Sequence, residues 1–365
     1  MLKRVALWGA AAISLVLLAF LIAYWRSDNT CGEAPRGTLM KAIVYCDYGA
    51  AEVLKYADIE KPTPAEHQVL VKVRAAALNP LDWHYMRGTP YLVRMSNGLR
   101  KPQSMRMGVD YSGVVEAVGK GVERFKPGDE VFGGRDGAFA EYVTVRDDRS
   151  VVMKPANMSF AQAAAVPIAA ITALQALRDK GKIQPGRKVL INGASGGVGT
   201  FAVQVAKSYG ADVTGVSSTR NLEMVRSLGA DHVVDYTKED FTKGEQRYDI
   251  VIDCVGNRKL FDIKRVMQPK GIYVLIGGGG PDEGNWIGPL LGFIKASLLS
   301  PFVSQDLGAL MAELNPKDLD VLGDLMRSGK VTPVIDRHYK LSEAAEAIKY
   351  LEAGHARGKV ILDID

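Results

Sequence analysis

The sequence predicts an α/β fold, in which a doubly wound parallel sheet is joined to a second, mostly antiparallel β domain behind an N-terminal transmembrane helix. Three observations predict this fold. Strand-like and helix-like patterns alternate from about residue 162 to residue 280, short β-type segments with Gly turns precede them, and an uncharged apolar run lies near the N-terminus. A chain of 365 residues is long enough for two domains besides that run.

The composition is that of an ordinary globular protein, with 47% hydrophobic and 24% charged residues, which excludes a disordered or fibrous chain. The net charge of +5 is small and dispersed, so no nucleic-acid partner is expected. The cysteines, Cys31, Cys46 and Cys254, form no C-x-x-C pair, which argues against a disulfide scaffold and a cysteine-built zinc site. A reducing compartment fits this cysteine usage best.

The apolar run extends from Val5 to Trp25 without a charged residue. As a helix rising about 1.5 Å per residue it would span roughly 32 Å, enough for a bilayer core of about 30 Å. We therefore expect residues 1–39 to form a single-pass membrane anchor and a polar tether. A cleaved signal peptide is the alternative, although the run exceeds the ~7–15 apolar residues of such a peptide.

The strongest motif is the glycine-rich segment NGASGGVG, from Asn192 to Gly199. It follows an apolar strand and opens an amphipathic helix, which is the context that a dinucleotide-binding fingerprint requires. Gly196 lets backbone N–H groups approach a pyrophosphate, and Gly199 lets the helix pack closely on the strand. A tight turn without a ligand is the alternative. The predicted cofactor-binding residues of this loop are Gly193, Ala194, Ser195, Gly196, Gly197, Val198 and Gly199.

The end of the next strand distinguishes NADP from NAD. An NAD site carries an acidic residue about 20 residues beyond the glycine loop, where it binds the ribose 2′-hydroxyl. Here the sequence is Ser217-Ser218-Thr219-Arg220, which offers hydroxyls and a guanidinium suited to a 2′-phosphate. We therefore predict NADPH as the cofactor, bound by Ser217, Thr219 and Arg220, with a solvated Arg220 as the alternative.

Several ordered segments carry a family resemblance: ALNPLDWHYMRG (77–88), MGVDYSGVV (107–115), AAAVPIAAITALQAL (163–177), GASGGVGTFAVQVAK (193–207) and GHARGKVIL (354–362). With them the chain resembles the medium-chain dehydrogenase/reductase superfamily, most closely its zinc-independent quinone oxidoreductase branch. The resemblance implies a GroES-like catalytic domain over residues 40–161, completed by 303–365, and a Rossmann NADP-binding domain over 162–302. NADPH is expected in the cleft between them. Relatives are often dimers, so a homodimer is one expectation.

The resemblance also argues against a metal. Zinc alcohol dehydrogenases of this superfamily carry a Cys where Asn79 stands and a His where Val109 stands. Neither replacement is a zinc ligand, so no metal site is predicted. The remaining chemistry is hydride transfer to an acceptor that is already activated, such as a quinone or an α,β-unsaturated carbonyl compound.

Further site residues come from the resemblance alone. Asn79 is expected to line the nicotinamide pocket as a catalytic residue, with a turn-forming role before Pro80 as the alternative. A tyrosine soon after the N-P-x-D motif donates the proton in related enoyl-thioester reductases, and Tyr91 lies one residue from that spacing; a packing role is its alternative. His84, Tyr85 or water are other candidate proton donors. Asp82 is expected to order its loop, with a catalytic role as the alternative. The remaining expected cofactor contacts are Thr172, Tyr236 (or an edge aromatic), Gly277 with Gly278, and Lys359 (or a surface lysine).

The sequence thus predicts an NADPH-dependent, zinc-independent oxidoreductase that transfers hydride to a quinone or an α,β-unsaturated carbonyl. An alcohol dehydrogenase of the same superfamily and a non-enzymatic NADPH-binding membrane adaptor are the alternatives. The body is expected on the cytoplasmic side of the membrane, because a redox enzyme without disulfides that consumes NADPH needs a compartment that regenerates it.

Overall fold

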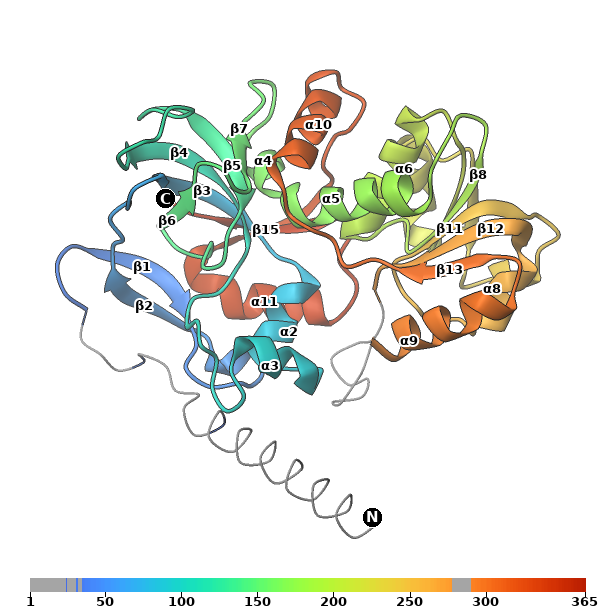
Figure 1. Cartoon of the computed structure of the whole chain (residues 1–365), viewed down its shortest axis with the longest axis horizontal. Coiled ribbons are helices and arrows are strands. Elements are labelled where there is room, and N and C mark those ends of the chain that lie inside the picture. The colour runs from blue at the N-terminus through green and yellow to red at the C-terminus, as the bar shows by residue number, and fades with distance from the viewer. Residues whose placement is uncertain (1–23, 25–30, 32–34, 278–289) are drawn as a thin grey trace, which may run out of the picture.

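Two sheets lie next to each other in this computed structural model, which describes residues 24, 31, 35–277 and 290–365 (Figure 1). One sheet is parallel and the other mostly antiparallel, which confirms the predicted α/β class with its second β domain. Helix α5 (Pro167–Gln175) runs between the two sheets.

The parallel sheet has six strands in the order β10-β9-β8-β11-β12-β13. Alternate residues of β8 point to opposite faces: Val189 and Ile191 join the core beneath α5 and α6, whereas Leu190 joins the core beneath α8 and α9. Both faces are therefore buried, as a parallel sheet requires. The strands are β8 (Lys188–Asn192), β9 (Asp212–Ser217), β10 (His232–Asp235), β11 (Tyr248–Asp253), β12 (Met267–Leu275) and β13 (Asp306–Ala309).

The chain order of these strands reverses beside β8. From β8 the chain proceeds outward through β9 and β10, and it then returns to place β11, β12 and β13 on the other side. In open α/β sheets, ligands bind outside the carboxyl ends of the strands at such a switch point. The last strand, β13, extends this sheet beyond residue 302, the end of the predicted Rossmann segment.

The second sheet has seven strands, with β14-β15-β3-β4-β5-β7 in order and β6 also paired to β3. The C-terminal strand β15 pairs antiparallel with β3, so that Ile361 lies opposite Ala77. One face of this sheet is buried around Tyr111 and Phe139, and Phe132 points to the opposite face, where it packs in the core that includes α5. The strands are β3 (Gln68–Ala77), β4 (Asp110–Val118), β5 (Glu130–Gly134), β6 (Tyr142–Arg146), β7 (Val151–Met153), β14 (Ile335–Lys340) and β15 (Lys359–Asp363).

Helices cover these sheets, and the longer ones bury an apolar stripe. Helix α10, for example, buries Leu319, Leu322 and Met326, which are spaced three and four residues apart, against the parallel sheet's core. The remaining helices are α2 (Pro80–Arg87), α3 (Arg94–Asn97), α4 (Phe160–Ala164), α6 (Gly197–Ser208), α7 (Leu222–Ser227), α8 (Leu260–Arg265), α9 (Leu290–Leu299), α10 (Pro316–Arg327) and α11 (Ala344–Glu352).

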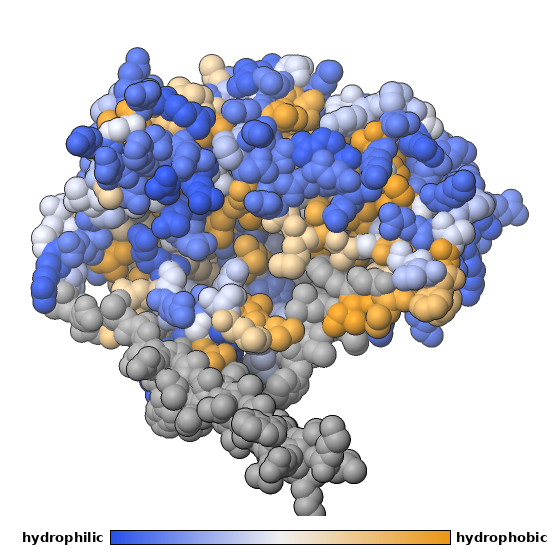
Figure 2. Space-filling view, viewed as in Figure 1, coloured by the Kyte–Doolittle hydropathy of each residue, from blue (hydrophilic) through white to orange (hydrophobic). Residues whose placement is uncertain are grey.

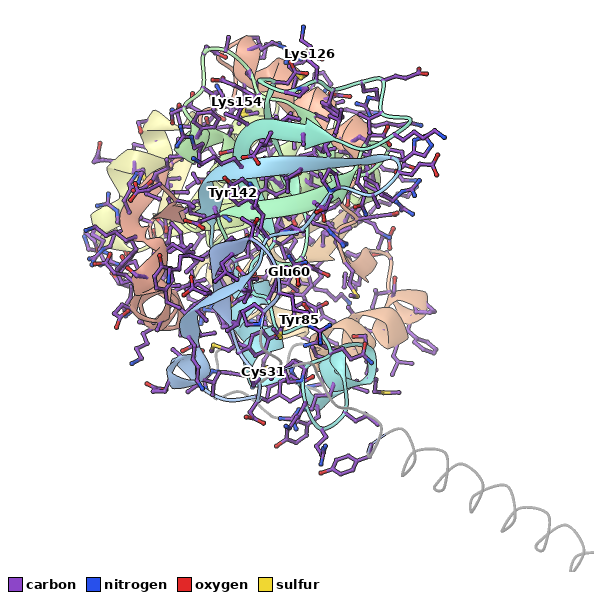
Figure 3. All side chains as sticks on the ribbon, turned by 90° about the vertical axis from the view of Figure 1, so that its left-hand side faces the viewer. Cys31, Glu60, Tyr85, Lys126, Tyr142 and Lys154 are labelled. Atoms are coloured by element: carbon purple, nitrogen blue, oxygen red, sulfur yellow. A yellow bond between two sulfur atoms is a disulfide. The ribbon has the colours of Figure 1, made fainter. Side chains whose placement is uncertain are left out.

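A two-stranded ribbon of β1 (Leu39–Val44) and β2 (Lys55–Glu60) is fastened by a disulfide between Cys31 and Cys46. Figure 3 labels Cys31 at the edge of the antiparallel domain. The prediction of a chain without disulfides was therefore wrong. Residue spacing gave no sign of the bond, because the two cysteines lie 15 residues apart in the sequence, on either side of β1.

The predicted transmembrane helix and membrane localisation are corrected. Across residues 24, 31, 35–277 and 290–365, no helix is both long and apolar enough to cross a bilayer. The run from Val5 to Trp25, which carried the prediction, lies outside the described residues except for Tyr24. The argument for a cytoplasmic body also loses its premise, because it assumed a protein without disulfides.

The disulfide predicts a specific pattern of thiol modification. Alkylation of the air-oxidised chain in denaturant should modify one thiol, Cys254, and alkylation after reduction should modify three. Peptide mapping by mass spectrometry measures both numbers and should recover Cys31 and Cys46 in one cross-linked peptide. Modification of all three cysteines without reductant would contradict the bond.

Candidate functional site

The site forms where the switch point of the parallel sheet meets the antiparallel domain. The carboxyl ends of β8 and β11 lie side by side there, joined by a hydrogen bond of 2.9 Å from the Asn192 amide to Asp253. Figure 2 shows apolar side chains gathered in the hollow between the two halves of the molecule. A ligand placed at this point would contact both sheets.

The glycine loop between β8 and α6 has the shape that a dinucleotide needs. Gly193 has a positive φ of 84°, and a Cβ at Gly199 would lie only 2.0 Å from the Gly193 oxygen. At Gly196, in contrast, the nearest atom to a Cβ would be 3.5 Å away, so the outer side of the loop is open. The loop leads into the N-terminus of α6, where unpaired N–H groups favour a phosphate. These features fit a bound pyrophosphate.

The C-terminal strand reaches this loop from the other domain. The Gly358 N–H donates to the Ser195 oxygen at 2.9 Å, and Gly196 forms a β-bridge with Gly358. The next residue, Lys359, packs its aliphatic side chain against the same loop: a Cβ on Gly197 would lie 3.3 Å from the Lys359 Cδ. The predicted phosphate loop and the predicted Lys359 contact are therefore neighbours in space.

The residues predicted to bind the 2′-phosphate lie together beyond the end of β9. Ser217 is buried and its hydroxyl has no hydrogen-bond partner in the described structure, which leaves it available to a ligand. The Arg220 guanidinium donates to the His355 oxygen at 2.9 Å and has no other acceptor among the described residues. Tyr236 is 50% exposed, directly after β10.

Asp235, at the end of β10, is an acidic group that sequence reasoning missed. Its carboxylate accepts hydrogen bonds from the hydroxyls of Thr219, at 2.5 Å, and of Thr237, at 2.7 Å. These bonds lower the pKa of Asp235 to about 2. Thr219 is therefore held by the Asp235 carboxylate. Only the residues that follow β9 entered the prediction from sequence, whereas Asp235 lies at the end of the neighbouring strand, β10.

A buried polar cluster lies on the other side of the glycine loop. The Lys359 ammonium donates to the Asn79 side-chain oxygen at 2.6 Å and lies 3.4 Å from Asp110. The Asn79 amide donates in turn to Asp110 at 2.9 Å. Lys359 is only 2% exposed, so the alternative of a surface lysine was wrong.

Each member of this cluster starts a different structural element. Asn79 precedes α2, Asp110 begins β4, and Lys359 begins β15. Asp110 also accepts from the Ile168 N–H at 3.1 Å, in the first turn of α5, and Asp82 accepts from the Asn79 N–H at 2.7 Å. Asp82 thus orders the start of α2, as predicted from its position in the motif.

Burial governs the ionisation of the cluster. It raises the pKa of Asp82 to about 8, and it also raises the pKa of Asp110. Burial lowers the pKa of Lys359, while the Asp110 carboxylate acts in the opposite direction. Three groups contact the Asp110 carboxylate: the Lys359 ammonium, the Asn79 amide and the Ile168 N–H. Only the ammonium carries a positive charge that can balance the charge of the carboxylate.

A cavity of about 150 Å³ opens beside the cluster. Asp82 and Val109 lie in its wall, and Tyr45, Tyr85, Arg106 and Asp136 are among the other lining residues. Burial raises the pKa of Tyr85, which therefore keeps its proton. Tyr85 comes from α2, and Figure 3 labels it.

The remaining predicted residues are placed as follows. Thr172 is buried in α5, with its hydroxyl donating to the Ile168 oxygen at 2.6 Å. Gly277 follows β12 in close contact with the chain at Cys254, and Gly278 lies outside the described residues.

Tyr91 is not among the residues that line the cavity; the Arg94 guanidinium lies 4.8 Å from its ring centre. His84 stacks on Trp83 and contacts the Thr89 oxygen at 2.7 Å.

No group of three His, Cys, Asp or Glu side chains is arranged to hold a metal ion within the described part of the chain. At the two positions where zinc-dependent relatives carry ligands, Asn79 is a hydrogen-bonding member of the cluster and Val109 lines the cavity.

Replacing Lys359 by Met should lower the free energy of unfolding by about 3–5 kcal/mol, because it leaves Asp110 buried without its cation. Adding Asp110→Asn should recover most of that loss. Urea denaturation measures both effects. The exposed Lys349→Met variant, which breaks a surface ion pair with Glu52, serves as the control and should change the stability little. Equal losses for the Lys359 and Lys349 variants would show that the cluster is not stabilised by this ammonium.

Two family models match the chain: the alcohol dehydrogenase GroES-like domain over residues 65–156, and the zinc-binding dehydrogenase model over residues 228–362. A 2-methylene-furan-3-one reductase of Solanum lycopersicum is 37% identical, covering 88% of this chain and 79% of the relative. An Arabidopsis thaliana protein named NADPH-dependent alkenal/one oxidoreductase, chloroplastic, is 36% identical over 92% of this chain and 82% of the relative.

Solved structures of quinone oxidoreductases also share the fold of this chain. The quinone oxidoreductase of Coxiella burnetii has a TM-score of 0.78 and 32% identity, covering 90% of this chain and all of that one. The Escherichia coli quinone oxidoreductase complexed with NADPH has a TM-score of 0.75 and 26% identity, covering 89% of this chain and 100% of that one. The chain therefore belongs to the medium-chain dehydrogenase/reductase superfamily, in its quinone oxidoreductase-like branch.

Proposed function

We propose that this chain is an NADPH-dependent oxidoreductase that reduces a quinone or an α,β-unsaturated carbonyl compound. The observation that carries the proposal is the meeting of the open glycine loop with the buried Lys359 cluster, next to a cavity. The activities for which the tomato and Arabidopsis relatives and the two quinone oxidoreductases of known structure are named support the same chemistry.

The cofactor would bind across the edge of the parallel sheet. The glycine loop from Gly193 to Gly199 would hold the pyrophosphate, and the hydroxyl of Ser217 with the Arg220 guanidinium would bind the 2′-phosphate. Thr219 and Tyr236 would border that phosphate. The ammonium of Lys238, 3.7 Å from the ionised Asp235 carboxylate, would offset part of that carboxylate's charge.

The nicotinamide end would lie between the cluster and α5. Asn79 and Lys359 would border it on one side, and Thr172 and Gly277 on the other. When bound, NADPH supplies a hydride to the acceptor, which is either a quinone or the electron-poor β-carbon of an α,β-unsaturated carbonyl compound. The part of the protein is to orient the two reactants and to exclude water.

The proton that completes the reduction would come from the cavity wall or from water. Tyr85 lines the cavity, and burial favours the protonated form of its hydroxyl. Asp82 lines it too, with one oxygen held by the Asn79 N–H. Tyr91 stays a prediction of the family resemblance, without a place in this wall.

The two alternatives from the sequence are not favoured. Alcohol oxidation in this superfamily depends on a Lewis acid at the positions of Asn79 and Val109, which offer no zinc ligand. A non-enzymatic adaptor would not need a cavity beside the cofactor site. The expected homodimer stays a prediction. We also propose the domain division 40–161 with the C-terminal segment and 162–302. The pairing of β15 with β3 supports it for the last strand, whereas β13 (Asp306–Ala309) pairs with the parallel sheet and so belongs with 162–302.

The proposal is tested by following NADPH absorbance with a panel of quinones, enones and primary and secondary alcohols. We expect NADPH oxidation with quinones or enones, and no NADP⁺ reduction with the alcohols. Chelators should leave the rate unchanged. An enzyme that oxidised alcohols and lost activity with a chelator would overturn the assignment, as would a protein that bound NADPH but turned over no acceptor.

Replacing Arg220 by Gln should weaken NADPH binding roughly 10- to 150-fold and leave NADH binding nearly unchanged, because a charged hydrogen bond to the 2′-phosphate is lost. Quenching of intrinsic fluorescence on titration gives both dissociation constants. Arg226→Gln, which removes an exposed arginine paired with Glu223, is the matched control. Equal losses for the two cofactors would exclude the assigned role of Arg220.

A further inference from the structure

The cavity beside the cluster contains a cation whose hydrogen-bonding capacity is unused. Arg106 is half-buried in the cavity wall, and its guanidinium makes no hydrogen bond or ion pair with any residue that the structure describes. Its stem packs over Gly137, where a Cβ would lie 2.9 Å from the Arg106 Nε. The side chain is thus positioned by packing, while its five N–H donors remain for a ligand.

The charges around Arg106 leave the cavity with a positive end. Burial lowers the pKa of Arg106, and repulsion from Arg135 adds to this effect, but an arginine stays charged near neutral pH. The acidic residues of the wall are Asp136 and Asp82. Asp136 is exposed and forms no ion pair with Arg106, although its charge helps to keep the pKa of Arg106 high. Burial raises the pKa of Asp82 and so favours its neutral form.

A second donor in the same wall also lacks a partner. The side-chain Nδ2 of Asn97 is buried and has no hydrogen bond in the described structure, although the backbone oxygen of Asn97 accepts one from Tyr48 at 3.0 Å. A buried donor without an acceptor is costly, and a ligand oxygen would remove that cost. Arg106 and Asn97 are thus two unsatisfied donors on one small cavity.

The size of the cavity restricts the molecule that fills it. Its 150 Å³ is about five times the ~30 Å³ that a water molecule occupies in the liquid, and below the ~300–1,000 Å³ of drug-sized ligand sites. A short acceptor fits such a space, whereas a long-chain quinone would have to leave its tail outside.

We propose that the acceptors of this enzyme include short α,β-unsaturated carbonyl compounds that carry a carboxylate, and that Arg106 binds this carboxylate with help from Asn97. A guanidinium pairs with a planar carboxylate through two parallel hydrogen bonds, which gives both affinity and a fixed orientation. Arg106 is then a specificity-determining residue, and it places the double bond of the substrate toward Asn79 and the cofactor. This inference rests on the proposed function.

The test compares three acceptors that share one enone: 4-oxopent-2-enoate, its methyl ester, and pent-3-en-2-one. Steady-state kcat/KM is measured with NADPH for the wild-type full-length chain, for Arg106→Gln, and for Arg135→Gln. Arg135 is the matched control, because it is a neighbouring arginine outside the cavity wall, and its removal changes the net charge equally.

We expect the wild-type enzyme to prefer the acid over the ester by at least tenfold. Arg106→Gln should lower kcat/KM for the acid roughly 10- to 100-fold, mainly through KM, and leave both neutral enones within about threefold. Arg135→Gln should leave all three nearly unchanged. Retained turnover of the neutral enones also shows that Arg106→Gln is folded.

Two results would overturn the inference without touching the proposed function: no wild-type preference for the acid, or an equal loss in Arg106→Gln and Arg135→Gln, which would mean a long-range charge effect. If no acceptor is reduced, the proposed function fails. Calorimetric titration of the acid into the NADPH-loaded chain then decides the subsite: weaker binding by Arg106→Gln supports it, and equal binding overturns it.

Discussion

The buried contact of the Lys359 ammonium with Asn79 and Asp110 is the interaction on which the rest of the site depends. It ties β15 to α2 and β4, and through the Ile168 N–H it reaches α5, the helix between the two sheets. A charge removed from water in this way is tolerated only because its partners satisfy it from several directions. The two halves of the molecule are thereby fixed against each other where the cofactor is proposed to bind.

The position of Lys359 also connects chemistry with architecture. The N–H of Gly358, the residue before Lys359, donates a hydrogen bond to the backbone oxygen of Ser195 in the glycine loop. The N–H of Asn79, which accepts from Lys359, donates to Asp82 in the cavity wall. A cofactor in the loop and an acceptor in the cavity would therefore be aligned by one rigid set of contacts. Such alignment is the main contribution that a protein makes when the cofactor supplies the reactive group.

Local patterns in the sequence predicted a large part of this structure. The glycine loop was recognisable because its context, an apolar strand before it and an amphipathic helix after it, is encoded by adjacent residues. The parallel sheet was predicted because strand-like and helix-like patterns alternate along this part of the chain. The motif around Asn79 and Asp82 was predicted only as a turn and an ordered loop, whereas the structure places it at the start of α2.

Long-range packing produced the features that sequence reasoning missed. The burial of Lys359 depends on Asp110, which lies 249 residues away along the chain. The Cys31–Cys46 bond joins residues that are 15 apart in the sequence, and Asp235 reaches Thr219 only because β10 lies beside β9. The unpaired guanidinium of Arg106 is visible only once the cavity wall has formed, because an isolated arginine in a sequence is typically solvated.

The most direct test of the central claim follows the hydrogen itself. NADPH labelled with deuterium at the transferred position of nicotinamide C4 is incubated with the chain and an enone, and the product is analysed by mass spectrometry and NMR. Direct transfer predicts deuterium at the β-carbon of the product and a solvent hydrogen at the α-carbon. NADPH oxidation that leaves the acceptor carbon without deuterium would contradict hydride transfer at this site.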